Sequence, residues 1–182
     1  MREGIRMKIA VVSDSHDHIW NTRRAVEQAN ILGAEVMLHC GDMVSPFMLE
    51  EFDRFKGKLH LILGNNPGDQ ILLMKSVLSR KDKVEFHGWF GRIEVCGVSI
   101  AFIHDPLEAR HIARSCDFPL VCFGHTHRWL MEYMGGMLLL NPGELLGRKE
   151  RPGWAMIEIP GTGKAGGAGP FSVEHIFIDD QV

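Results

Sequence analysis

Residues 8–18 read KIAVVSDSHDH, an apolar run that ends in a cluster of polar side chains. A short apolar run of this kind predicts a buried β-strand, and Asp14 and His16 follow its carboxyl end. Because Asp14 and His16 are two positions apart, their side chains would point to the same face of an extended chain. The stretch therefore predicts a strand that brings a carboxylate and an imidazole to one site, although a strand-end aspartate also commonly caps a turn.

Further polar blocks follow other apolar runs along the chain. They are Gly41-Asp42, Gly64-Asn65-Asn66, His104 and Gly124-His125-Thr126-His127. Strand and helix patterns alternate through the first half of the chain, which favours a parallel, doubly wound sheet. Ligands of such sheets bind beyond the carboxyl ends of the strands, so the blocks are expected to meet there.

Each block alone also has an ordinary structural explanation. Asp42 suits a turn, Asn65 begins the turn-forming run Asn-Asn-Pro-Gly, and a lone His104 suits a hydrogen-bonded core position. His125 and His127 form the strongest single block, because His-x-His places two imidazoles for one metal or for two neighbouring ones. Taken together, the blocks supply two carboxylates, four imidazoles and one amide, enough ligands for two divalent metals.

The remaining patterns complete the expected fold. Strands are predicted at 8–13, 36–40, 59–63, 84–87, 92–95, 98–103, 120–123, 137–140, 154–159 and 171–178, and helices at 21–32, from Ser45-Pro46, from Asp69 to about Ser79, and at 106–115. Asn21 is the predicted cap of the first helix, and the glycine-rich segment 161–170 is a predicted hairpin loop. Residues 1–182 are therefore expected to form a single α/β domain with two mixed sheets flanked by helices.

Composition narrows the class of protein. Of the 182 residues, 45% are hydrophobic and 24% charged, and the net charge of −3 gives no basic footprint for nucleic-acid binding. No signal peptide is visible, and no apolar run approaches the roughly 18 residues that a membrane span needs. The four cysteines form no C-x-x-C pair, which favours reduced core thiols of a cytoplasmic protein: Cys40, Cys96, Cys116 and Cys122.

The order and spacing of the polar blocks resemble the calcineurin-like metallophosphoesterase family, whose pattern is D-x-H, GD, GN, H and GH-x-H. More narrowly, SDSHDH (13–18), HCGD (39–42), GNN (64–66) and NPGE (141–144) are similar to its small prokaryotic phosphodiesterase branch. The likeness runs from about Met7 to Gly143. It implies a four-layer αββα sandwich of two mixed β-sheets flanked by helices.

The resemblance also implies a ligand set. Asp14, His16 and His127 would bind one metal, Asn65, His104 and His125 the other, and Asp42 would bridge them. Two cations held about 3.5–4 Å apart activate water in two-metal hydrolases. Manganese is the family's expectation, while nitrogen and oxygen donors also fit iron, zinc or nickel.

The expected activity is that of a dinuclear metal-dependent phosphodiesterase in which a metal-bridging hydroxide attacks phosphorus. Asp42, Asn65, Asn66 and His104 are the expected catalytic residues. Asn66 stands where many relatives carry a histidine, and an amide cannot protonate a leaving group. We therefore expect diesters, or substrates with good leaving groups, to be preferred.

Four residues are candidates for the substrate rim, each with a plainer alternative. Asp17 and His18 suit the start of a helix, and Arg148 suits a solvated loop, as does Arg151. Asp105 replaces a glycine that usually follows the histidine in relatives. It suits either an acceptor that orients His104 or a turn before Pro106.

The other aromatic side chains fall into two groups. The tryptophans are candidates to line the pocket or an interface: Trp20, Trp89, Trp129 and Trp154. Trp20 and Trp129 are the better rim candidates, because they follow metal blocks. The remaining histidines are assigned structural or surface positions: His39, His60, His87, His111 and His175.

Two alternatives belong to other classes. A relative of this fold is a non-catalytic subunit of the retromer coat, so the fold alone does not give activity. A phosphomonoesterase is the other alternative, and Asn66 argues against it. The complete ligand set favours the enzyme, with a small-molecule or nucleotide phosphodiester as partner and no membrane. The hydrophobic C-terminal strands suggest a homodimer or tetramer.

Overall fold

The structure is a computed structural model that describes residues 6–160 and 171–178. Its strands are β1 (Arg6–Val12), β2 (Val36–His39), β3 (Lys58–Leu61), β4 (Val84–Phe86), β5 (Phe90–Val95), β6 (Val98–Ile103), β7 (Leu120–Cys122), β8 (Trp129–Met134), β9 (Met137–Pro142), β10 (Gly153–Pro160) and β11 (Ser172–Phe177). Its helices are α1 (Ile19–Ile31), the 3₁₀ turn η1 (Pro46–Met48), α2 (Leu49–Phe52), α3 (Gln70–Leu78) and α4 (Pro106–Ser115). The predicted hairpin loop 161–170 lies outside the described residues.

The first sheet has six strands in the order β11-β10-β1-β2-β3-β4. β1 to β4 are parallel, because a helical segment crosses over between each consecutive pair: first α1, then η1 with α2, and then α3. β10 returns from the far end of the chain and pairs antiparallel with β1, placing Ile157 beside Ile9. This order leaves β4 at one edge of the sheet.

The second sheet has five strands in the order β5-β6-β7-β9-β8. β6 and β7 are parallel, and α4 connects them. β5 with β6 and β8 with β9 are antiparallel hairpins. The first of these turns at Cys96-Gly97, as its sequence predicts, with positive φ at both residues.

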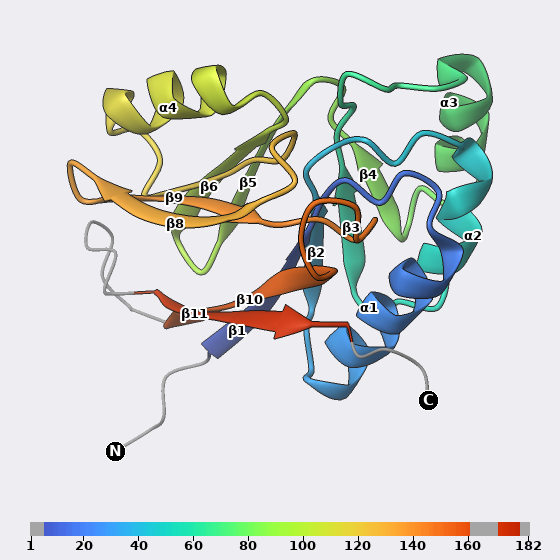
Figure 1. Cartoon of the computed structure of the whole chain (residues 1–182), viewed down its shortest axis with the longest axis horizontal. Helices are drawn as coiled ribbons and strands as arrows, with labels where there is room; N and C mark the ends of the chain where they lie inside the picture. The colour runs from blue at the N-terminus through green and yellow to red at the C-terminus, as the bar shows by residue number, and fades with distance from the viewer. Residues whose placement is uncertain (1–5, 161–170, 179–182) are drawn as a thin grey trace.

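Three buried clusters show that the molecule has four layers. One lies between the first sheet and helices α1 to α3, a second between the two sheets, and a third between the second sheet and α4 (Figure 1). β1 contributes to two of them, because successive side chains of a strand point to opposite faces: Ala10 and Val12 face the helices, while Ile9 and Val11 face the other sheet. The predicted αββα sandwich of two mixed sheets is confirmed.

Two details differ from the predictions. The strand β8 was not expected, because its sequence WLMEYM shows no regular alternation and its residues are half-buried or exposed. Helix α1 begins at Ile19, and its cap is His18, whose Nδ1 accepts a hydrogen bond from the backbone N–H of Asn21 at 3.2 Å. The predicted cap Asn21 is therefore wrong, since Asn21 already lies in the first turn.

Candidate metal centre

The seven predicted ligands lie beyond the carboxyl ends of five strands, where the two sheets come together. Asp14 and His16 follow β1, Asp42 follows β2, Asn65 follows β3, His104 follows β6, and His125 and His127 follow β7. Hydrogen bonds tie these loops together. The backbone N–H of Asp14 donates to the carbonyl of Gly41 at 3.1 Å, and that of His125 donates to Asp14 Oδ2 at 3.0 Å. The sheets thus converge on one polar site.

Strained backbone is concentrated at this site. Among the described residues, nine non-glycine residues have positive φ, and five of them are predicted ligands: Asp14, His16, Asp42, His125 and His127. Such conformations are uncommon outside glycine and cluster at functional sites. The expectation that Asp14 and His16 share a face of an extended chain is therefore wrong. They meet because a left-handed turn, with φ of 51° and 39°, curls the chain back on itself.

Two glycines allow neighbouring loops to approach closely. A Cβ on Gly64 would lie 2.2 Å from Asp42 Oδ1, and a Cβ on Gly124 would lie 2.0 Å from the Ser13 hydroxyl. Neither site has room for a side chain. The glycines that precede the ligand blocks therefore allow the ligands of different strands to meet.

Asp14, His16 and His127 form a first group of converging ligand atoms. Asp14 Oδ1 lies 3.4 Å from His127 Nε2 and 3.9 Å from His16 Nε2, and the two imidazole rings stack with centroids 5.1 Å apart. One oxygen and two nitrogens within 4.8 Å of one another could surround a single cation.

Asn65, His104 and His125 form a second group. Asn65 Oδ1 lies 2.9 Å from His104 Nε2 and 2.7 Å from His125 Nδ1. Asp42 lies between the two groups, with Oδ2 3.4 Å from His16 Nε2 and 3.6 Å from His104 Nε2. A single carboxylate thus faces both sets of ligands.

Outer contacts fix the orientation of two imidazoles. Nδ1 of His104 lies 2.8 Å from the carbonyl of Cys40, and Nδ1 of His127 lies 2.6 Å from Glu144 Oε2. Because a carbonyl and a carboxylate only accept, Nδ1 carries the proton in both rings. In the neutral rings the Nε2 lone pairs then face the site, as in metal centres where an outer acceptor orients the ligand.

Buried polar atoms at the centre fit a cation. Asp14 Oδ1 and His16 Nε2 are buried and have no hydrogen-bond partner. Buried polar atoms are normally paired, and a divalent metal would satisfy both of these at once. The donors are nitrogen and oxygen without thiolate, which suits manganese, iron, zinc or nickel.

The two aspartates differ in their electrostatics. Burial raises the pKa of Asp14, although Ser13, His104 and His127 oppose it. Burial alone would also raise the pKa of Asp42, but the His104 imidazole and hydrogen bonds from Asn66 outweigh it and hold the pKa well below its usual range. Asp42 is therefore an anion at neutral pH.

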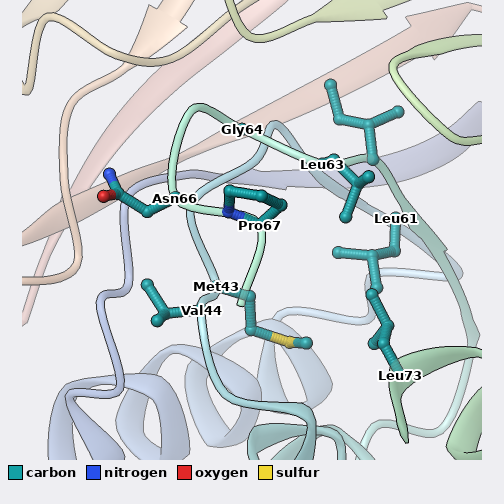
Figure 2. A pocket seen from close by; sticks show the side chains of 9 residues that line it. Met43, Val44, Leu61, Leu63, Gly64, Asn66, Pro67 and Leu73 are labelled. Atoms are coloured by element: carbon teal, nitrogen blue, oxygen red, sulfur yellow. The ribbon is translucent and has the colours of Figure 1, made fainter. Parts of the chain in front are cut away.

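Asn66 holds Asp42 through its backbone N–H and its side-chain amide. Its backbone N–H reaches Asp42 Oδ1 at 2.8 Å, and its side-chain amide reaches Oδ2 at 2.6 Å. Figure 2 shows this side chain pointing away from Leu61 and Leu73, which help line an apolar cavity of about 10 Å³ beneath the turn. A space of that size holds about one water molecule, so it is too small to bind a substrate.

Two of the rim candidates support the loops around the centre. Asp17 accepts hydrogen bonds from the backbone N–H of Ser45 at 2.8 Å and from its hydroxyl at 2.5 Å. His18 caps α1, as described above. Their contacts are structural, and a role with substrate stays a prediction.

The other two rim candidates lie on exposed loops. Asp105 caps α4, with Oδ1 accepting from the backbone N–H groups of Leu107 and Glu108 at 2.8 and 3.0 Å. The nitrogens of His104 face Cys40 and Asn65 rather than Asp105, which favours the turn assignment of Asp105 over the orienting one. A role of Asp105 with substrate stays a prediction. Arg148 is exposed between β9 and β10.

Three further rim candidates, two tryptophans and Arg151, take part in ring-stacking or cation–π contacts. Trp129 stacks on His175 with centroids 4.0 Å apart, and the guanidinium of Arg151 lies 4.8 Å from the ring centroid of Phe177. Trp20 is exposed beside Arg23.

A cavity of about 150 Å³ opens directly beside the second ligand group. Its walls include Trp89, Ile103, Asp105 and Glu108, together with Gly64 and the ligands Asn65, His104 and His125. Of these, Glu108 carries no motif and was not predicted, while Trp89 was a pocket candidate ranked below Trp20 and Trp129. Glu144 was not predicted as a site residue either, although the NPGE motif contains it.

The chain matches known proteins of one family. The model of the calcineurin-like phosphoesterase superfamily domain matches residues 7–161. Phosphodiesterase MJ0936 of Methanocaldococcus jannaschii is 32% identical over 143 residues, which cover 78% of this chain and 86% of that protein. A solved archaeal phosphodiesterase is 27% identical with a TM-score of 0.82, covering 94% of this chain and 100% of that one.

A third match concerns the fold alone. The zinc complex of wild-type Vps29 from Entamoeba histolytica has a TM-score of 0.59 at 15% identity, with 94% of this chain and 99% of that one covered. Within the described ranges, no helix is long and apolar enough to cross a membrane.

Proposed function

Since the chain belongs to the calcineurin-like phosphoesterase superfamily and is a metal-dependent phosphoesterase, we propose that it hydrolyses phosphate diesters at a dinuclear centre. The observation that carries the proposal is the position of Asp42. Its Oδ2 lies within 3.6 Å of an imidazole nitrogen from each ligand group, which is where a bridging carboxylate belongs.

The proposed ligand sets follow the two groups described above. Asp14, His16 and His127 hold one cation, Asn65, His104 and His125 hold the other, and Asp42 contacts both. When bound, two divalent cations polarise the phosphoryl oxygens and lower the pKa of a shared water molecule. Manganese is the proposed metal on the strength of the family resemblance, and the nitrogen and oxygen donors without thiolate are compatible with it.

Side chains next to the ligands fix the tautomer of His127 and the orientation of Asp42 before a cation binds. Burial alone would raise the pKa of Glu144, but hydrogen bonds from His127 and from the backbone of Glu150 and Lys149 lower it. Glu144 is therefore an anion that keeps His127 Nε2 directed at the site. Asn66 holds Asp42 in a fixed orientation, so its carboxylate does not have to reorganise when charge develops on the phosphoryl group.

The preference for diesters rests on Asn66. Its backbone N–H and its side-chain amide both donate to Asp42, and an amide cannot act as an acid at neutral pH. The leaving group must then depart without receiving a proton from this position, which favours diesters with good leaving groups over monoesters.

The organic part of the substrate is proposed to occupy the 150 Å³ cavity. Trp89 and Ile103 give it an apolar wall, and Asp105 and Glu108 give it an acidic one. It adjoins Asn65 and His104, so a group bound there would lie next to a phosphate at the metal centre. A small-molecule or nucleotide diester fits this arrangement.

Three wider predictions accompany the proposal. We propose that residues 1–182 form one domain, since a single set of layers contains both ends of the described chain. All four cysteines are free thiols, which supports a reducing, cytoplasmic environment. The homodimer or tetramer expected from the C-terminal strands stays a prediction.

A non-catalytic scaffold on the same fold is the competing function, because the fold is shared with Vps29 at 15% identity. The complete ligand set argues for catalysis. A scaffold has no need for ligand residues in strained backbone, or for buried donor atoms without partners such as Asp14 Oδ1 and His16 Nε2.

The test is an assay of metal-stripped protein restored with Mn²⁺, using bis(p-nitrophenyl) phosphate beside p-nitrophenyl phosphate. We expect the diester to be hydrolysed faster. Asp42→Asn should lower this rate by about a thousandfold or more, because a bridging carboxylate contributes several kcal/mol to the bound cations and the transition state. Asp82→Asn, a matched change in an exposed turn, should leave it unchanged.

Two outcomes would contradict the proposal. A monoester turned over faster than the matched diester would overturn the diester preference. If folded, metal-loaded protein hydrolysed neither ester, the scaffold would replace the enzyme.

A further inference from the structure

A second cluster of metal-ligating side chains lies on the edge of the six-stranded sheet. His60 on β3 and Glu85 on the edge strand β4 are direct neighbours across the parallel pair. His87 follows β4 directly, and its backbone N–H donates to the carbonyl of Leu61 at 2.9 Å. None of the three belongs to the ligand groups of the metal centre, and the proposed function does not use them.

The three side chains share one face of the sheet. Leu59 and Leu61 pack toward the helices, so His60 between them points toward the second sheet. There the ring of His87 meets Phe102 of β6 edge to face, with centroids 5.2 Å apart. The cluster therefore sits at the open margin of the layer between the sheets, where Glu85 is 47% exposed.

The ligand atoms converge to metal-binding distances. His60 Nδ1 lies 2.9 Å from His87 Nε2, and the Glu85 carboxylate oxygens lie 3.9 Å from the first and 3.8 Å from the second. Two nitrogens bound to one tetrahedral zinc ion stand about 3.3 Å apart, given bonds of about 2.0–2.1 Å. The imidazoles need to separate by only a few tenths of an ångström to admit the ion.

We infer that His60, Glu85 and His87 form a separate binding site for a borderline divalent cation such as Zn²⁺. Two imidazoles and one carboxylate are a ligand set that zinc accepts, with water completing the tetrahedron. The ion would join β3 to the edge strand β4 and protect an edge of only three residues.

The chemical state of the imidazoles suits a cation. Burial, with His87 and Lys58, lowers the pKa of His60 to about 4 against the opposing effect of Glu85. Burial also lowers the pKa of His87, again against Glu85. Both rings are neutral at pH 7, so each can offer a lone pair without first losing a proton.

Lys58 competes for the carboxylate. Its Nζ lies 2.5 Å from Glu85 Oε2, and the two side chains are 43% and 47% exposed. Ion pairs this exposed are weak, because water screens them. A divalent cation held by two imidazoles can therefore displace the ammonium, at some cost in affinity.

The test is equilibrium dialysis of the metal-free full chain against Zn²⁺, followed by analysis of the metal bound to the protein. Wild type should retain one equivalent more than His87→Gln. His111→Gln, a matched change on the exposed face of α4, should retain as much as wild type. Equal stoichiometry in wild type and His87→Gln over the same range of free zinc would overturn the site.

Two further variants separate loss of a ligand from loss of the fold. Glu85→Gln changes an exposed side chain without altering its shape, and it should weaken binding of this equivalent by tenfold or more. Lys58→Met should strengthen it, because the competitor is gone. Unchanged affinity in Glu85→Gln, with circular dichroism showing folded protein, would also overturn the site.

Discussion

The metal centre at the strand ends and the His60–Glu85–His87 cluster at the sheet edge both place imidazoles beside carboxylates. At the centre, Asp14 Oδ1 and His16 Nε2 are buried without partners. At the edge, the imidazoles hydrogen bond to each other and Lys58 pairs with the carboxylate.

The backbone conformations of the two sites also differ. Five of the seven ligands at the centre have positive φ, whereas His60, Glu85 and His87 lie on or beside regular strands. The centre therefore keeps its donors in position before a cation arrives, and the edge cluster must exchange existing contacts for it. We expect the centre to bind divalent cations more tightly than the edge.

The largest effect among the outer contacts should come from Glu144→Gln. The amide weakens the hold on His127 and introduces N–H groups where an acceptor is needed, so the ligand loses its fixed tautomer. Loss of such an outer partner typically costs about 10- to 100-fold in metal affinity or activity. Manganese titration and diester kcat/KM would measure both.

The control for this change is Glu94→Gln on the exposed face of β5, which should match wild type. If Glu144→Gln matched that control in manganese affinity and in diester kcat/KM, the proposal that the centre holds its ligands in place before a cation binds would be wrong.

A smaller effect is expected at the cavity beside the centre. Trp89 is 58% exposed and lines that cavity, so Trp89→Ala should raise KM for an aromatic diester about three- to tenfold with kcat nearly unchanged. Tyr133→Ala is the control, because Tyr133 is an aromatic residue on β8 that is 51% exposed and lines no part of this cavity. A change confined to kcat, or equal effects of the two substitutions, would show that the cavity does not bind the substrate.

The smallest effect concerns pH and the edge cluster. The folded-state pKa of His60 is about 4, below the ordinary value of about 6.5 in an unfolded chain. As pH falls from 6.5 toward 4, the unfolded chain takes up a proton that the folded protein does not, so stability falls with pH. Metal-free His60→Gln should lose less stability than wild type between pH 7 and pH 5.

The difference should be roughly 1 kcal/mol, or about 2–4 °C in Tm, after allowance for partial exposure. Thermal unfolding at the two pH values measures it, with His111→Gln expected to follow wild type. An identical decline in His60→Gln would mean that His60 is not held neutral by the edge cluster.

The strand-end ligands were predictable because short-range signals mark them. Apolar runs give the strands, and glycines such as Gly64 and Gly124 stand where neighbouring loops touch. The resemblance supplied the order of the layers. What the pattern missed was the left-handed backbone at Asp14 and His16, since a period-two argument assumes an extended chain.

Other features depend on long-range pairing that no local pattern reveals. Trp89 reaches the cavity only because β5 pairs with β6 next to His104. His60 meets Glu85 only through the register of β3 with β4. One feature of the sequence could have revealed β8, namely the Gly135-Gly136 turn before β9. Two glycines between two strands indicate a β-hairpin.

The central claim is that Asp42 joins two cations in one centre. Electron paramagnetic resonance of the protein loaded with Mn²⁺ tests it most directly, because ions that share a bridging ligand are magnetically coupled. The account predicts a coupled-pair spectrum at two equivalents, replaced in Asp42→Asn by the six-line signal of isolated ions. A six-line signal from wild type at two equivalents would contradict it.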